Sequence, residues 1–299
     1  MTPAEFLSAV WPAAGPYVLA TPFMLPSMTR PSFRHRTFDT IAQVIAYVDT
    51  AKSQLNLFFG VHALKQHRIW NPLKLDPKTN ELGAFEVRTQ ANSRATKSFY
   101  LDIDVGVGTH KYATQAEALQ GLKSFCVATG LPRPMLVTSG TGLHAYWTLT
   151  DEISSDDWRV PAIKLKSLAR HFGLEADPAR TSDSASVLRV PGTFNHKDTT
   201  APRPVSLLTT CAPMALADFV ALLDTAMIRA DLRTPAMPKT APVDALGFEN
   251  NTKEIFSGPP VTLKSLVTAC AQVRRVVLAR GNVSEPEWYH TLNLVRFTA

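Results

Sequence analysis

Apolar residues follow two different spacings along this chain. Intervals of three and four residues predict helices over 39–51, 114–129 and 156–172, and glycines at 130 and 173 close the last two. Alternating or continuous apolar runs predict strands over 55–61, 98–105, 134–138, 143–149, 187–190 and 204–208. We expect 134–138 and 143–149 to pair as antiparallel strands around a glycine turn. Because no strict βαβ repeat occurs, the pattern favours an α+β fold over a doubly wound parallel sheet.

The pattern changes after the last predicted strand. Residues 226–260 are rich in Pro and Thr, which predicts an extended linker, and the shorter stretch 72–83 reads as a loop. Beyond the linker, 262–277 has helical spacing, and a capping box at 284–287 predicts the start of a second helix. We therefore predict a main domain over 1–225, a linker over 226–260 and a small helical domain over 261–299. The chain ends within a predicted helix, so we expect a piece of a longer protein.

Composition narrows the function classes only slightly. Lys and Arg number 31 against 25 Asp and Glu, a formal net charge of +6, which permits a polyanionic partner but, being unclustered, singles none out. The three cysteines are far apart and no Cys/His group has zinc spacing, so we expect free thiols and no zinc. No apolar stretch approaches the roughly 18 residues of a membrane span. We expect a cytoplasmic protein with no membrane partner.

The strand predicted over 98–105 carries two carboxylates, Asp102 and Asp104. Side chains alternate along a strand, so the two project from the same face. Two neighbouring buried carboxylates repel and are costly to desolvate, and a divalent cation with oxygen ligands would relieve both costs. The alternative is that this face is solvated and binds nothing.

Two further polar clusters follow along the chain. The first is SGTGLHAYW over 139–147, a glycine turn that leads into a strand bearing His144. The second runs from Asp183 through Arg189 to Lys197 and combines a carboxylate, a strand and a basic turn. Each has a structural alternative, since a histidine on a half-buried strand is often a core residue and Arg189 could pair with Asp183.

Taken in order, these clusters resemble the three motifs of the archaeo-eukaryotic primase superfamily, and most closely those of phage and plasmid primase-polymerases. The resemblance rests on LDIDVG, SGTGLHAYW and RVPGTFNHK, and covers roughly residues 98–208. It implies an RRM-like antiparallel sheet as the catalytic core within 1–225, beside an N-terminal α/β part. It also implies a small all-helical domain after the core and a helicase-like region C-terminal to this chain.

The resemblance assigns roles position by position. Asp102, Asp104 and Asp183 resemble the metal ligands, and with His144, which would contact the phosphates of the nucleotide, they form the implied catalytic set. Asp177 is an alternative to Asp183 as the third ligand. Many members carry a serine at the position of Gly142, so here the implied phosphate cradle consists of glycine amides and one hydroxyl. The implied nucleotide- and phosphate-binding residues are Ser139, Gly140, Gly142, His144, Arg189 and Lys197.

The implied activity is template-directed nucleotidyl transfer by a DNA polymerase or primase in phage or plasmid replication. Two Mg²⁺ or Mn²⁺ ions would be the cofactors, and the partners would be single-stranded or primed DNA and nucleoside triphosphates. One alternative is a metal-dependent phosphodiesterase or nuclease, because two carboxylate-held metals also cleave phosphodiesters. A second is a replication-origin DNA-binding module without catalysis. The sequence leaves open de novo priming or primer extension, the sugar of the nucleotide, the preferred metal and the oligomeric state.

Overall fold

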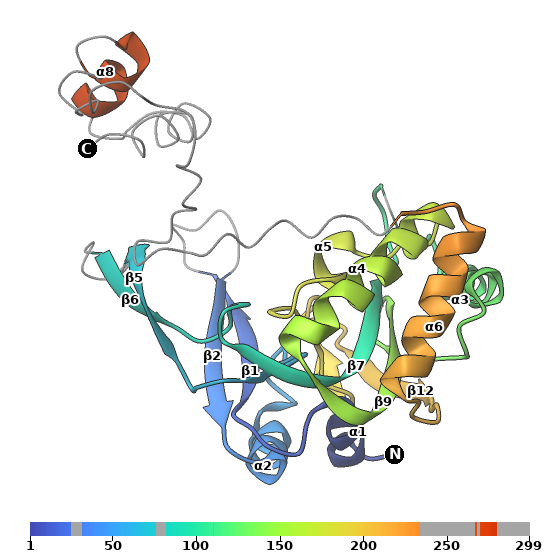
Figure 1. Ribbon diagram of the computed structural model, residues 1–299. Coiled ribbons are helices and arrows are strands. Elements are labelled where there is room, and N and C mark those ends of the chain that lie inside the picture. The colour runs from blue at the N-terminus through green and yellow to red at the C-terminus, as the bar shows by residue number, and fades with distance from the viewer. Residues whose placement is uncertain (25–31, 76–81, 110, 234–266, 268–269, 280–299) are drawn as a thin grey trace. The chain divides into compact units, whose positions relative to one another are not determined.

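The computed structural model describes residues 1–24, 32–75, 82–109, 111–233, 267 and 270–279 (Figure 1). Contacts divide the chain into two compact units, Met1–Lys239 and Thr240–Ala299. Within the first unit, helices are mixed with antiparallel strands, which confirms the α+β prediction. No helix in the described parts is both long enough and apolar enough to cross a membrane.

A six-stranded sheet forms the centre of the first unit, in the order β11-β12-β8-β9-β7-β4. All of its pairings are antiparallel. The predicted pair around the glycine turn is confirmed, and the predicted aspartate strand is longer than expected at its start. The strands are β4 (Ala63–Leu64), β7 (Ser93–Ile103), β8 (Met135–Thr138), β9 (Leu143–Ser154), β11 (Thr193–Asn195) and β12 (Arg203–Thr209).

A second, four-stranded sheet has the order β10-β3-β1-β2 and is also antiparallel. It joins N-terminal strands to one strand from the third sequence motif, so the motif residue Arg189 leaves the central sheet and lies on the other one. The strands are β1 (Tyr17–Phe23), β2 (Ser32–Phe38), β3 (Phe58–Gly60) and β10 (Val187–Arg189).

The prediction of a loop over 72–83 is wrong at both of its ends. A two-stranded hairpin of β5 (Ile69–Leu75) and β6 (Leu82–Glu86) occupies this part of the chain. Pro72 suggested a loop because proline cannot donate a hydrogen bond to a sheet ladder. A hairpin has two free edges, however, and the pairing register shifts between Asn71 and Leu75, so the proline is tolerated there.

Side-chain caps start all the described helices of the first unit except the last one. The side chains of Thr114 and Ser154 accept hydrogen bonds from backbone amides three residues further on, and Gly130 adopts a left-handed φ of 73° at the end of α3. The predicted helices are thus confirmed, whereas α1, α5 and α6 were not predicted. The helices are α1 (Pro3–Val10), α2 (Ile41–Ala51), α3 (Gln115–Thr129), α4 (Ser155–His171), α5 (Pro178–Thr181) and α6 (Leu216–Arg229).

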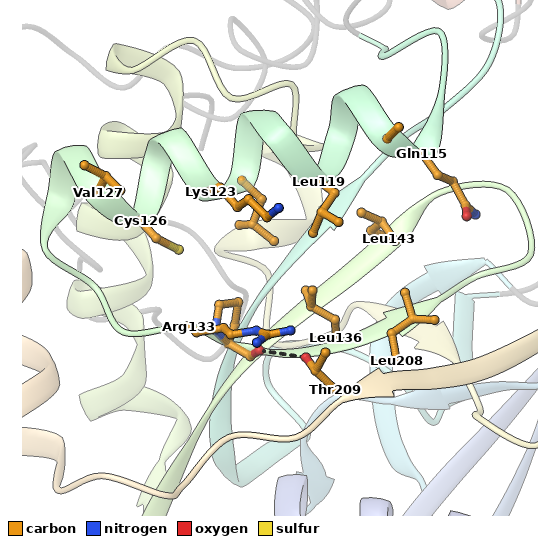
Figure 2. Close-up of a pocket in the computed structure, with 13 residues that line it drawn as sticks. Gln115, Leu119, Lys123, Cys126, Val127, Arg133, Leu136, Leu143, Leu208 and Thr209 are labelled. Carbon is orange, nitrogen blue, oxygen red and sulfur yellow. Dashed lines mark hydrogen bonds between the residues drawn. The ribbon is translucent and has the colours of Figure 1, made fainter.

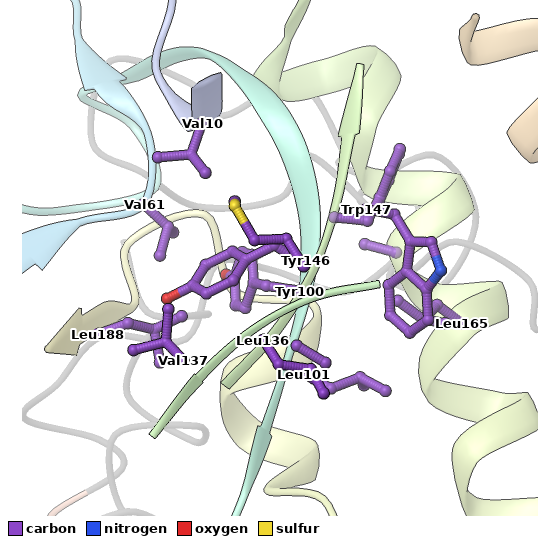
Figure 3. Packing of buried hydrophobic residues seen from close by; sticks show 14 of the residues in the cluster. Val10, Val61, Tyr100, Leu101, Leu136, Val137, Tyr146, Trp147, Leu165 and Leu188 are labelled. Carbon is purple, nitrogen blue, oxygen red and sulfur yellow. The ribbon is translucent and has the colours of Figure 1, made fainter. Parts of the chain in front are cut away.

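The central strands β7 and β9 present two different faces. Phe99 pairs with Trp147, and the ring of Phe99 stacks on Phe219 of α6. One residue further along, Tyr100 pairs with Tyr146 on the opposite face, where the ring of Phe6 of α1 meets Tyr146 edge-on. Figure 3 shows this division, with Trp147 beside Leu165 of α4 and Tyr146 reaching toward Val137 and Leu188. The second face therefore looks toward the four-stranded sheet.

The C-terminal unit is described only in part. Helix α8 (Ala271–Leu278) overlaps the predicted helix 262–277, and the helix expected from residue 284 lies outside the described residues. Most of the predicted linker also lies outside them, and α6 extends four residues into it. The division into a domain over 1–225, a linker over 226–260 and a helical domain over 261–299 stays a prediction.

Candidate active site

Asp102 and His144 are direct cross-strand partners at the end of the central β7–β9 pair. Asp102 Oδ1 lies 3.6 Å from His144 Nε2, and the hydroxyl of Tyr146 lies 3.4 Å from His144 Nδ1. Antiparallel pairing places opposite residues on one face, so register alone brings together residues that are 42 positions apart in the sequence. The structure thus joins the first and second motifs.

Both side chains are buried, and burial changes their ionisation. Burial raises the pKa of Asp102 to about 7; Arg180 opposes this rise, while Asp104 and Asp177 add to it. Burial lowers the pKa of His144 to about 3, and Arg189 and Arg180 act in the same direction. The imidazole is therefore neutral at pH 7. Its contact with Asp102 is consequently not an ion pair, and at 3.6 Å it is longer than a hydrogen bond.

Arg180 is a site residue that the sequence analysis missed. Its Nε lies 3.2 Å from Asp102 Oδ2 and 3.0 Å from Asp177 Oδ2, so one guanidinium joins two carboxylates. The only available signal was the spacing of Asp177 and Arg180, which are three residues apart. This cation balances the negative charge buried at Asp102.

The backbone also brings Asp177 to the end of β7. The amide of Asp177 donates to the carbonyl oxygen of Asp102 at 2.8 Å, next to a bridge between Ile103 and Ala176. Asp177 then caps α5 by accepting from the amide of Ala179 at 2.9 Å. Asp177 therefore shares the Arg180 guanidinium with Asp102.

The other predicted carboxylates lie further from this centre. Asp104 follows the end of β7 rather than standing on it, its side chain is 48% exposed, and Lys111 Nζ lies 3.9 Å from it. Asp183 accepts hydrogen bonds from the side chain of Gln90 and from the amide of Ala185. Asp177, which shares Arg180 with Asp102, therefore lies nearer this centre than Asp183, and the identity of the third metal ligand stays a prediction.

The glycine turn is closed by its own hydrogen bonds. Ser139 Oγ accepts from the amide of Gly142 at 3.0 Å, and Thr138 Oγ1 accepts from the amide of Gly140 at 3.2 Å. The predicted phosphate cradle of Ser139, Gly140 and Gly142 would have to exchange these bonds for a ligand. A Cβ on Gly142 would lie 2.4 Å from the carbonyl oxygen of Ile103. Glycine is thus required here, and no serine fits without a shift of the backbone.

Arg189, a basic residue of the third motif, lies on the four-stranded sheet. Arg189 donates to the side chain of Asn56 at 2.7 Å, and its guanidinium lies over the ring of Phe58 at 4.5 Å. Arg189 is close enough to Asp102 for each charge to affect the pKa of the other. The alternative pairing of Arg189 with Asp183 is not observed. Lys197 is exposed, and its amide donates to Asn195, so its predicted phosphate role stays a prediction.

The donor chemistry of this centre fits a hard divalent cation. Asp102, Asp104 and Asp177 offer carboxylate oxygens, which Mg²⁺ and Mn²⁺ prefer, and the buried carboxylate of Asp102 needs a positive partner. Within the ranges that the structure describes, no three His, Cys, Asp or Glu side chains converge tightly enough to hold a metal. Arg180 occupies the position of the compensating charge.

A pocket of about 700 Å³ lies elsewhere, between α3 and strands β8 and β12. Figure 2 shows Leu119, Leu136 and Leu208 facing into it, with Lys123 and Arg133 among its few polar side chains. It contains none of the predicted site residues, and its lining is mostly apolar. This apolar pocket and the charged site are therefore separate features.

No family model and no curated protein matches the chain. Solved structures of similar shape include primase RepB′ (TM-score 0.45, 16% identity) and the AEP domain of the primase-polymerase of cyanophage S-2L (TM-score 0.43, 14% identity). The first match covers 77% of this chain and 62% of the other, and the second covers 70% and 89%. A third is the polymerase domain of Mycobacterium tuberculosis ligase D in complex with DNA (TM-score 0.37, 16% identity, 73% and 82% covered). The chain spans about three fifths of the length of the RepB′ chain.

Proposed function

We propose that this chain is the catalytic part of a DNA polymerase or primase that performs metal-dependent, template-directed nucleotidyl transfer. The observation that carries the proposal is the direct pairing of Asp102 with His144, with Asp177, Arg180 and Arg189 gathered around them. The three sequence motifs that resemble the archaeo-eukaryotic primase superfamily supply Asp102, His144 and Arg189, and the segment before the third motif supplies Asp177 and Arg180. Replication of phage or plasmid DNA is the setting implied by that resemblance.

The proposed metal ligands are Asp102 and Asp104, with Asp177 as the third carboxylate. When bound, two metal ions would stabilise the attacking 3′-oxygen and the departing pyrophosphate oxygen of an in-line displacement. The carboxyl of Asp102 must lose its proton and its contact with Arg180 before it can serve as a ligand. A cation of higher charge than a guanidinium favours that ionised form more strongly.

Arg189 is the proposed partner of the triphosphate. Its guanidinium is fixed by Asn56 and by the ring of Phe58, so little reorganisation is needed when charge develops on the leaving group. Its position on the second sheet, facing the Asp102 carboxylate, means that a nucleotide would bind between the two sheets. The neutral imidazole of His144, beside the Tyr146 hydroxyl, can donate one hydrogen bond to a phosphate oxygen.

Arg180 then has two successive roles in this proposal. Without metal it neutralises Asp102 and Asp177, which keeps like charges from destabilising the site. If a metal were bound, Asp102 and Asp177 would hold it in place of Arg180, whose 39% exposed side chain would then be free to contact the phosphates. One guanidinium offsets only part of the negative charge of the two carboxylates, so a divalent cation would offset more of it.

Extension of a labelled primer on a longer template tests this function. The unmodified chain, with all four dNTPs and Mg²⁺ or Mn²⁺, should produce a ladder of longer products, and Asp102→Ala/Asp104→Ala should produce none. Repeating the assay without primer and with NTPs tests priming. The control variant Asp151→Asn changes an exposed carboxylate on β9 and should extend normally.

Other outcomes would identify the alternatives. A primer that becomes shorter in the presence of metal, without need of triphosphates, would favour the phosphodiesterase or nuclease. Sequence-preferring DNA binding that neither metal nor Asp104→Ala alters, with no product, would favour the origin-binding module.

A further inference from the structure

The β5–β6 hairpin carries a solvent-facing pair of aromatic rings that the site above does not use. Trp70 and Phe85 are cross-strand partners, and their rings meet edge-on with centroids 5.1 Å apart. They are 55% and 52% exposed, among the largest exposed fractions of any aromatic side chain in the described residues. Large rings in water are unusual without a binding role, since they dominate recognition surfaces when they are exposed together.

The geometry of the hairpin holds these rings in place. A Cβ on Gly83 would lie 2.4 Å from Trp70 Cζ2, so the indole rests directly on the backbone of that glycine. Arg68, directly before β5, places its guanidinium 4.1 Å from the centre of the Phe85 ring. We name Arg68, Trp70 and Phe85 the hairpin platform.

Charge on this platform is positive. Arg68 has no carboxylate partner among the described residues, whereas the acidic Glu86 is already paired with Lys74 at 2.9 Å and accepts from Asn71. Trp70 pairs with Phe85 across the hairpin, and Glu86, the next residue of β6, points to the opposite face. A ligand with flat π-faces could stack on the exposed rings, and negative charge on that ligand would be attracted to Arg68.

A series of guanidinium and aromatic groups leads from the base of the hairpin to the candidate active site. Arg88, just after β6, donates to His35 of β2 at 3.3 Å and lies 5.4 Å from the ring of Phe33. Phe33 meets the ring of Phe58 edge-on at 5.8 Å, and Phe58 lies beneath Arg189. The hairpin is also tied to β2 by His67, whose Nδ1 lies 2.8 Å from Thr37 Oγ1. A series of pairwise contacts through Arg88, Phe33 and Phe58 therefore leads from the residues that follow the hairpin to Arg189, and Arg88 also donates to the carbonyl oxygen of Ala185.

We propose that the hairpin platform binds single-stranded DNA by stacking unpaired bases on Trp70 and Phe85, with Arg68 and Arg88 contacting phosphates. Sequence-independent single-strand sites combine stacking rings with a basic track along the backbone, and both are present here. The inference deepens the proposed function, on which its relevance rests, by naming where the template strand is held before it reaches Arg189. Duplex DNA, whose bases are stacked internally, cannot use the rings.

Anisotropy of a fluorescently labelled oligothymidine, without nucleotide or metal, tests this directly. Trp70→Ala and Phe85→Ala should each weaken binding about tenfold, the usual scale for loss of one stacked base. Arg68→Gln should reduce the dependence of log Kd on log salt by about 0.7, the value for one phosphate contact on a single strand. Val127→Ala and Arg170→Gln, which change exposed positions on α3 and α4, should leave binding unchanged.

A conservative variant separates stacking from folding. Trp70→Phe should retain affinity within about twofold because any aromatic face stacks on a base, yet it should lose the quenching of tryptophan fluorescence that DNA causes. Trp11, Trp147 and Trp158 are fully buried and so do not report on a base stacked at the surface. The fifth tryptophan, Trp288, lies outside the described residues and is replaced by Phe in both proteins that are compared. Unchanged affinity in both alanine variants, or competition by duplex DNA as strong as by single strands, would overturn the inference.

The two proposals fail in different ways. Normal primer extension together with normal oligothymidine binding in Trp70→Ala would contradict DNA binding by the hairpin platform and leave the proposed nucleotidyl transfer standing. Oligothymidine binding that depends on Trp70, in a protein that never extends a primer, would support the hairpin platform and contradict the proposed polymerase activity. Val127→Ala and Arg170→Gln would have to behave as the unmodified chain in either case.

Discussion

The candidate active site and the hairpin platform hold positive charge in opposite ways. At the site, Arg180 lies between two carboxylates, and burial moves the pKa of Asp102 and of His144 far from their usual values. On the platform, Arg68 lies over an aromatic ring in solvent and pairs with no described carboxylate. Buried charge with shifted pKa values is typical of chemistry, and exposed charge on rings is typical of binding. The proposed chemistry and the proposed DNA binding thus lie on different sheets.

The largest effect is expected from Asp102→Asn. The amide keeps the shape of the side chain but cannot act as an anionic ligand, so nucleotide incorporation should fall by roughly 10³-fold or more. Asp151→Asn is the matched exposed control, and DNA binding by the platform should not change. Incorporation that survives Asp102→Asn would break the assignment of chemistry to the buried site.

The same substitution should stabilise the metal-free protein at high pH. The carboxyl has a pKa of about 7 when folded and an ordinary value of 3.8, so between these values the folded state binds more protons than the unfolded state. Its contribution to stability is present below pH 4 and is lost as pH rises through 7. Asp102→Asn should therefore raise the melting temperature more at about pH 8 than at about pH 4. If Asp102→Asn changed the melting temperature by the same amount at both pH values, Asp102 would not be buried as described.

The next effect concerns Arg189, the residue that links the two regions. Arg189→Ala should lower nucleotide incorporation by roughly 10²-fold, the scale of losing one fixed electrostatic group. Arg189→Lys should recover only part of this, because lysine keeps the charge but not the planar stacking on Phe58. Arg170→Ala on the exposed face of α4 is the control, measured by steady-state kinetics with varied nucleotide concentration. Full activity of Arg189→Ala would remove it from the site.

A smaller effect is expected at the glycine turn. Gly142→Ala places a methyl group against the carbonyl oxygen of Ile103, and we expect the free energy of unfolding to fall by about 1–3 kcal/mol. Thr141→Ala, in the same turn, should cost less because it removes atoms rather than adding them. Urea denaturation of the three proteins measures the difference, and an equal stability of Gly142→Ala and the unmodified chain would show that the backbone shifts freely.

The smallest effect concerns His62, a buried histidine, and the dependence of stability on pH. Burial lowers the pKa of His62 to about 3, so the unfolded state takes up a proton below pH 6.5 and the folded state does not. Stability is therefore lost as pH falls, by about 2 kcal/mol at pH 5. In His62→Leu, the free energy of unfolding from urea titrations should change less between about pH 7 and pH 5. An unchanged pH slope would contradict the burial of this histidine.

The sequence predicted the strands and helices that bear the motifs because their spacing and caps are local. Short patterns predicted the helix that ends at Gly130 and the antiparallel β8–β9 pair that follows it. Asp102 and His144 were each singled out, although their pairing depends on register between distant strands. The RRM-like form of the sheet came only from the resemblance.

Other features had no sequence signal strong enough to find them. Arg180 reaches Asp102 because the chain returns to the end of β7 at Ala176, a contact between residues 73 positions apart. The same return brings Asp177 beside Asp102, so our proposal takes Asp177 as the third carboxylate, whereas the sequence favoured Asp183 and kept Asp177 as the alternative. The hairpin was missed because Pro72 and the polar residues around it have the composition of a loop, whether or not they form a strand.

Templated incorporation of a single nucleotide is the most direct test of the central claim. A primed template is offered one complementary or one mismatched dNTP with Mg²⁺ or Mn²⁺, and the chain is compared with Asp102→Asn and Asp151→Asn. We predict that the unmodified chain and Asp151→Asn add the complementary nucleotide and release pyrophosphate, and that Asp102→Asn does neither. Equal incorporation by Asp102→Asn, or none by any of the three while single-stranded DNA is still bound, would contradict the account.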